Sequence, residues 1–148
     1  MKTLLVATLV LALALATGCV RFVEGYTVTF RSTTGVELAK GQIMLSSPLP
    51  ATGTIRGWYK LEMRHVRASS KDIEAFYQLF KGKESGQVEW VVGRVGTTAS
   101  RFDFMPSSAE GSVIASATQM ARGYWSGRWS YTVFTGEYSG GSIDIARK

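Results

Sequence analysis

The 148-residue sequence predicts a mainly β protein, a single antiparallel barrel or closed sandwich of about eight strands with one short helix. Three observations lead to this class. Apolar and polar residues alternate along several short segments, as they do in strands with one buried face. Clusters of glycine, serine and threonine separate these segments and are typical of turns. One segment, 70–81, has helical rather than alternating spacing.

The first part of the chain contains three predicted strands. The first begins at about residue 26, the second covers about 36–45 and the third about 55–63. A loop with Pro48 and Pro50 precedes the third strand, because proline cannot donate a hydrogen bond to a ladder. Alternation predicts one buried face for the first and third strands, comprising Tyr26, Val28, Phe30, Ile55, Gly57, Tyr59, Leu61 and Met63.

The segment 70–81 interrupts the alternating pattern. Ile73, Phe76 and Phe80 have helical spacing, and Ser70 is a candidate N-cap. The alternative is another strand, which would place Phe76 and Phe80 on the same face as charged residues. The spacing therefore favours a short helix.

Further strands are predicted over about 88–92, 102–104, 112–122, 124–138 and 142–147. Ser139-Gly140-Gly141 separates the last two and predicts a hairpin turn with positive φ. Gly136 predicts a bulge. About eight strands can close into a small barrel whose interior holds side chains or one small ligand. In this coarse respect the chain resembles lipocalin-type and avidin-type barrels.

The run 123–131, GYWSGRWSY, is the most distinctive part of the sequence. On a strand, Trp125, Trp129 and Tyr131 share one face, and Arg128 lies on the other. One interpretation is an aromatic pocket or platform in which Trp125, Arg128, Trp129 and Tyr131 contact a ligand or partner. The other, which we favour, is that the aromatic residues form the core of a domain without disulfides.

The N-terminus has a separate character. Lys2 precedes an almost unbroken apolar run from Leu4 to Ala16, which is typical of a secretory signal and shorter than the roughly 20 residues that span a bilayer. Ala16-Thr17-Gly18-Cys19 resembles the lipobox of bacterial lipoproteins, with Ala16 where leucine is preferred. The resemblance implies that the leader is removed and that Cys19, the only cysteine, carries a diacylglyceryl group and an N-linked acyl chain such as palmitate.

These features divide the chain into a leader (1–18), a short lipidated tether (19–25) and one β domain (26–148). The tether spans at most about 20 Å, so we expect the domain to lie against the membrane. In the lipoprotein family, a residue such as Val20 after the cysteine favours the outer membrane over the inner membrane. The full chain has a net charge of +6, and removal of the leader with Lys2 leaves +6 − 1 = +5. This charge would attract the domain to anionic lipid, and ordinary solubility is an equal interpretation.

Residues suited to catalysis or metal binding are scarce. His65 is the only histidine, which excludes any metal site with two histidine ligands. The acidic residues are dispersed, and Asp103 and Asp144 are expected on the solvated face of their strands. We therefore predict no catalytic residue, no metal and no cofactor. Nucleic acid is not an expected partner, because the protein is exported and its basic residues are scattered.

Three functions of different classes are compatible with the sequence. The leading one is a non-catalytic interaction or structural lipoprotein that docks on an envelope protein or on the membrane surface. The second is a carrier that holds a small hydrophobic ligand or a glycan in the barrel. The third is an inhibitor of a host lysozyme, which is disfavoured because lysozymes are usually basic, as this domain is. The sequence leaves the oligomeric state open.

Overall fold

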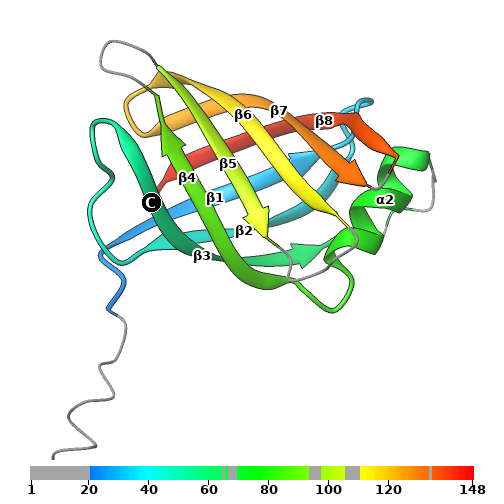
Figure 1. Cartoon of the computed structure of the whole chain (residues 1–148), viewed down its shortest axis with the longest axis horizontal. Helices are drawn as coiled ribbons and strands as arrows, with labels where there is room; N and C mark the ends of the chain where they lie inside the picture. The colour runs from blue at the N-terminus through cyan, green and yellow to red at the C-terminus, as the bar shows by residue number, and fades with distance from the viewer. Residues whose placement is uncertain (1–20, 65, 67–69, 94–97, 106–110, 134) are drawn as a thin grey trace, which may run out of the picture.

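The computed structural model describes residues 21–64, 66, 70–93, 98–105, 111–133 and 135–148. Cys19 and His65 therefore lie outside the described residues. Eight antiparallel strands form a closed barrel in chain order, in which each strand pairs with the next and β8 pairs with β1 (Figure 1). The predicted barrel is thus confirmed. The strands are β1 (Glu24–Arg31), β2 (Glu37–Leu45), β3 (Gly53–Met63), β4 (Ser85–Val92), β5 (Ala99–Met105), β6 (Ser112–Ala121), β7 (Tyr124–Val133) and β8 (Gly136–Arg147).

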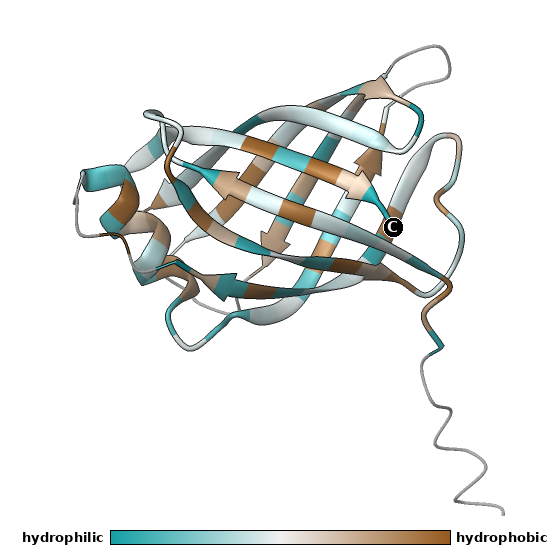
Figure 2. Ribbon diagram, turned by 180° about the vertical axis from the view of Figure 1, so that it is seen from behind, coloured by the Kyte–Doolittle hydropathy of each residue, from teal (hydrophilic) through white to brown (hydrophobic). Residues whose placement is uncertain are grey.

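The alternating sequence explains the barrel wall. Along β1 and β3, the residues predicted to be apolar and inward-facing are buried, except that Met63 at the end of β3 is only partly buried, and the residues between them are more exposed. Figure 2 shows this alternation as brown and teal bands along the strands. Large side chains fill the interior, and the largest that are fully buried include Trp90, Trp129, Tyr26, Tyr59 and Phe30. Burial of this apolar surface is the main force that stabilises the fold.

The segment 70–81 forms the predicted helix, α2 (Lys71–Phe80), and not the alternative strand. Ser70 is its N-cap, since the Ser70 hydroxyl accepts a hydrogen bond from the Ile73 amide at 3.4 Å. The fully buried Phe76 ring lies 5.2 Å from the Phe30 ring and 5.1 Å from the Trp129 ring, between centroids. The helix therefore closes one end of the barrel, at the right of Figure 1.

The predicted turn at 139–141 is wrong. These residues lie inside β8, and β7 joins β8 through residues 134–135. The register between the two strands shifts beside Trp129, so the bulge is at Gly140 rather than at the predicted Gly136. Neither glycine of the predicted turn has a positive φ, and a Cβ at Gly140 would collide with the Trp129 ring. These glycines are needed for close packing.

The first strand begins at Glu24 rather than at the predicted Tyr26. Glu24 pairs with Leu45 at the end of β2. The alternating pattern missed this position because a charged residue does not continue an apolar face. The predicted tether, 19–25, therefore overlaps the first strand by residues 24–25.

Candidate functional site

The four residues predicted to contact a ligand do not share one surface. Trp125, Trp129 and Tyr131 point into the barrel, where they are 6%, 0% and 6% exposed, whereas Arg128 lies on the outer wall. The Trp129 indole donates a hydrogen bond to the Arg31 carbonyl at 2.8 Å. These placements favour the core interpretation of the aromatic run. Trp125 is the member closest to solvent, since it lines a pocket at one end of the barrel.

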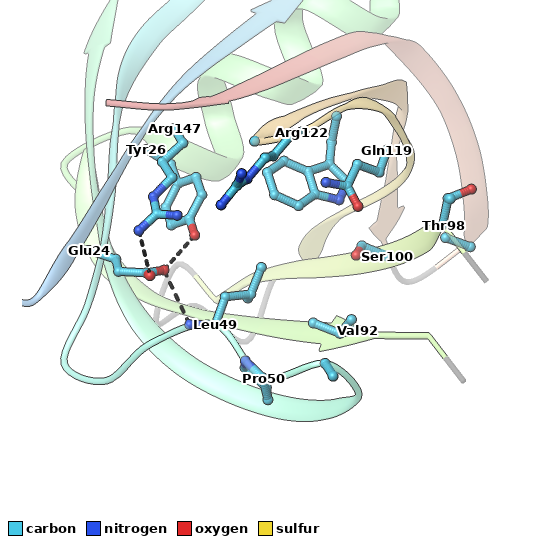
Figure 3. A pocket seen from close by; sticks show the side chains of 14 residues that line it. Glu24, Tyr26, Leu49, Pro50, Val92, Thr98, Ser100, Gln119, Arg122 and Arg147 are labelled. Atoms are coloured by element: carbon cyan, nitrogen blue, oxygen red, sulfur yellow. Dashed lines mark hydrogen bonds and ion pairs between the residues drawn. The ribbon is translucent and has the colours of Figure 1, made fainter. Parts of the chain in front are cut away.

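This pocket lies at the end of the barrel opposite α2, which we call the open end. Here the odd-numbered strands begin and the even-numbered strands end, because every neighbouring pair is antiparallel. The pocket has a volume of about 260 Å³ and is shown in Figure 3. Its lining includes Glu24 and Tyr26 of β1, Leu49 of the β2–β3 loop, and three residues near the chain's last strands, namely Arg122, Trp125 and Arg147.

Glu24 connects three segments at the open end. Its carboxylate accepts hydrogen bonds from the Tyr26 hydroxyl at 2.6 Å and from the Leu49 amide at 3.2 Å. The other carboxylate oxygen pairs with the Arg147 guanidinium at 2.9 Å. The Tyr26 hydrogen bond lowers the pKa of Glu24, and Arg147 acts in the same direction against the opposing effect of burial. Glu24 is therefore a charged carboxylate that joins β1, the β2–β3 loop and β8.

Tyr26 is the neutral partner in this network. Burial raises the pKa of its hydroxyl, and the hydrogen bond to the Glu24 carboxylate raises it further. The phenol therefore stays protonated and acts as a donor at physiological pH.

Arg122 and Arg147 are held next to each other by the turn between β6 and β7. Gly123, in that turn, has φ +76°, a conformation that favours glycine. The Arg147 amide donates a hydrogen bond to the Gly123 carbonyl at 2.7 Å, which fixes the turn against the end of β8. Figure 3 shows both guanidinium groups on the Tyr26 side of the pocket.

The two arginines differ in how their charge is balanced. Arg147 pairs with Glu24, which is the only acidic residue among the described residues that line the pocket. Within the described part of the chain, no carboxylate lies within ion-pair distance of Arg122. The pocket therefore presents a guanidinium whose charge is available to an anion.

Aromatic side chains form the floor of the pocket. The Tyr26 ring lies 4.9 Å from the Trp90 ring and 5.9 Å from the Trp125 ring, and the two tryptophan rings are 5.1 Å apart. These rings occupy the space through which a ligand would pass into the barrel. The pocket therefore ends at these rings and does not continue into the barrel interior.

Two acidic residues of the outer wall, Asp103 and Asp144, are not simply solvated as the sequence predicts. Asp103 was expected to be solvated, but its Oδ1 is buried and has no hydrogen-bond partner among the described residues. Desolvation raises the pKa of Asp103, and the nearby Glu89 adds to this effect while Arg101 opposes it. Asp144 is also not simply solvated, because it pairs with Arg31 and accepts a hydrogen bond from the Tyr124 hydroxyl at 2.8 Å.

Across the described ranges, no three His, Cys, Asp or Glu side chains are grouped so that they could hold a metal ion. In the same ranges, no helix combines the length and hydropathy needed to cross a bilayer.

Sequence reasoning missed the charged residues of the open end. Glu24, Arg122 and Arg147 are far apart in the chain and match no motif. A usable signal was nevertheless present, because an up-and-down barrel brings the start of β1 and the ends of β6 and β8 to the same rim. Comparison of the chain with protein-family models, with curated proteins and with solved structures gives no match.

Proposed function

We propose that this protein is a non-catalytic lipoprotein of the bacterial cell envelope, anchored through Cys19 and acting at the membrane surface. The outer membrane is the expected location. The observation that carries the choice of an interaction role over a carrier role is the filled interior. The Trp90 ring, for example, lies 4.4 Å from the Phe102 ring and 5.1 Å from the Trp125 ring. A barrel packed in this way suits a structural or interaction role better than transport of a ligand in its interior.

The position of the N-terminal segment supports the anchored arrangement. Arg21 is two positions after Cys19 in the sequence, and the chain enters β1 at the open end. Two residues span at most about 7 Å, so a lipid on Cys19 would hold the open end near the bilayer. In this arrangement the open end faces the bilayer, and the outer wall and the α2 end face away from it.

The anchor is tested by expressing the full chain in a Gram-negative host and measuring the intact mass of the mature protein. We expect a membrane-bound protein that begins at Cys19 and carries the mass of a diacylglyceryl group and an acyl chain. Cys19→Ser should abolish this modification, whereas the neighbouring Val20→Ala should retain it. A wild-type protein that is unmodified, or that is cleaved elsewhere, would contradict the anchor.

The filled interior is tested separately with the mature Cys19→Ser domain. Trp58 is exposed and Trp125 lines the pocket of the open end, so the test uses a variant with Trp58→Phe and Trp125→Phe. Emission from the remaining Trp90 and Trp129 should show no saturable change when fatty acids or envelope glycans are added, because both are fully buried. A saturable spectral shift with one ligand class would instead support the carrier function.

A further inference from the structure

We infer that the open end of the barrel is a docking face for an anionic lipid bilayer, with Arg122 as the residue that contacts a lipid phosphate in the pocket. The inference rests on the proposed function only for the direction from which the membrane approaches. The charges, the exposed apolar residues and the pocket itself are independent of the anchor.

Basic side chains outnumber acidic ones in the described part of the open end. Arg122 and Arg147 both line the pocket, and Glu24, the one acidic residue in the described lining, is already paired with Arg147. The exposed Arg21 precedes β1 on the same rim. A guanidinium can bind two phosphate oxygens at once, and Arg122 has no competing carboxylate among the described residues. This geometry suits a phosphate anion.

Exposed apolar side chains lie beside the arginines of the open end. Phe22 and Val23, which lead into β1, are 40% and 53% exposed, and Met120 near the end of β6 is 66% exposed. Met120 lies where the register between β6 and β7 shifts, next to the turn that holds Arg122. A rim with both basic and exposed apolar side chains is suited to the boundary between lipid headgroups and acyl chains. A free phosphate ion would make no use of the apolar residues, so we assign the site to lipid.

The other surfaces of the barrel are less suited to an anionic bilayer than the open end is. The outer wall carries exposed charged residues, such as Lys40, Lys60 and Glu62, along its strands. The opposite end is covered by α2, where Asp72 and Glu74 are balanced by nearby lysines such as Lys71 and Lys81. An anionic bilayer is therefore attracted more strongly to the open end, where Arg122 has no acidic partner among the described residues. The chain also enters β1 at this end, close to the proposed anchor.

The test uses the mature domain with Cys19→Ser, so that no lipid on the protein contributes to binding. Binding is measured by co-sedimentation with vesicles of phosphatidylcholine alone and with vesicles that also contain phosphatidylglycerol. We expect binding to the anionic vesicles that weakens as salt is added. Arg122→Gln should weaken the partition constant about fivefold, and the double variant with Arg21→Gln should weaken it about 25-fold. Met120→Ser should weaken binding at every salt concentration.

Two variants serve as matched controls. Arg128→Gln removes a basic side chain from the outer wall, and Val36→Ser removes an exposed apolar side chain next to β2, at the α2 end. Both should bind vesicles as the parent domain does. Unchanged melting temperatures for all variants would show that the fold is retained, as expected for exposed positions.

Several results would overturn the inference. One is equal binding to neutral and anionic vesicles, and another is a loss for Arg128→Gln as large as that for Arg122→Gln. Full competition by millimolar inorganic phosphate would assign the pocket to a free anion rather than to a membrane. Because this test uses unlipidated protein, its failure would leave the proposed anchor standing, and the mass measurement above tests that anchor alone.

Discussion

Single glycines decide how closely the strands can pack. At Gly140, β8 crosses the face of the Trp129 ring, and at Gly141 it passes the Arg31 carbonyl of β1 so closely that a Cβ would collide with it. The two residues therefore let the last strand close the barrel over its largest side chain. This packing role explains why a Gly-Gly pair occurs in the middle of a strand, where glycine is ordinarily unfavourable.

Gly140→Ala is expected to destabilise the protein by about 3 kcal/mol, because the added methyl group must displace a fully buried indole. Urea unfolding followed by circular dichroism measures the change. Gly25→Ala is the matched control, since its Cβ would meet only the Lys148 side chain at 3.6 Å, an ordinary contact. A loss for Gly140→Ala no greater than that for Gly25→Ala would mean that β8 does not cross Trp129 as described.

Glu24 is the residue whose charge matters most at the open end. Its carboxylate is 11% exposed and binds Arg147, Tyr26 and the Leu49 amide. A carboxylate whose pKa is lowered by folding contributes stability above its ordinary pKa of 4.5, and this contribution is lost as pH falls through the lower folded value. The open end should therefore loosen in acid.

Glu24→Gln is expected to cost about 1 kcal/mol of unfolding free energy at pH 7, because the amide cannot form the ion pair with Arg147. The difference from wild type should shrink as the pH falls below 4.5 and should vanish below the lowered folded pKa, where the folded wild-type carboxylate also loses its charge. Denaturant unfolding at a series of pH values measures both effects. The exposed Glu62→Gln on the outer wall should show neither, and a pH-independent loss for Glu24→Gln would contradict the proposed role of its charge.

At the scale of elements, α2 is part of the hydrophobic core and not only a surface helix. Ile73, Phe76, Leu79 and Phe80 are buried on one face, and the Phe76 ring contacts β1 through Phe30 and β7 through Trp129. The helix covers apolar side chains that the strands alone would leave in contact with water at this end.

Phe76→Ala is expected to destabilise the protein by about 4 kcal/mol, since it removes a fully buried ring and leaves a cavity. Thermal and urea unfolding measure the loss. Glu74→Ala, on the exposed face of the same helix, should change stability by no more than about 0.5 kcal/mol. Similar small effects for both variants would show that α2 is not packed into the barrel.

Elements with a strong periodic pattern could be predicted from the sequence, and those shaped by packing could not. The alternation in β1 and β3 and the helical spacing of 70–81 depend on local residue order, and all three predictions are confirmed. The continuous β8 was missed because a glycine pair is typical of a turn, and the local sequence does not reveal that Trp129 lies beneath it. The burial of the Asp103 carboxylate was missed for a similar reason, since it depends on neighbouring strands.

At the scale of the whole molecule, the two ends of the barrel have different chemistry. One end is closed by the apolar face of α2, and the other has a pocket with Glu24, Arg122 and Arg147 above an aromatic floor. The aromatic run was recognised in the sequence, but its role as floor and core depends on barrel closure. The charged rim could not be located from local sequence, because it is assembled from the start of β1 and the last strands.

The central claim is that the open end faces the membrane, and the most direct measurement is the orientation of the anchored protein on anionic liposomes. In lipidated protein the Cys19 thiol is blocked, so a single fluorophore can be attached at Met120→Cys on the open end or at Val36→Cys near the α2 end. If the open end faces the membrane, the label at position 120 should show blue-shifted emission and quenching by brominated lipid. The label at position 36 should show a water-like spectrum without quenching. Equal quenching at both positions, or quenching at position 36 alone, would contradict this orientation.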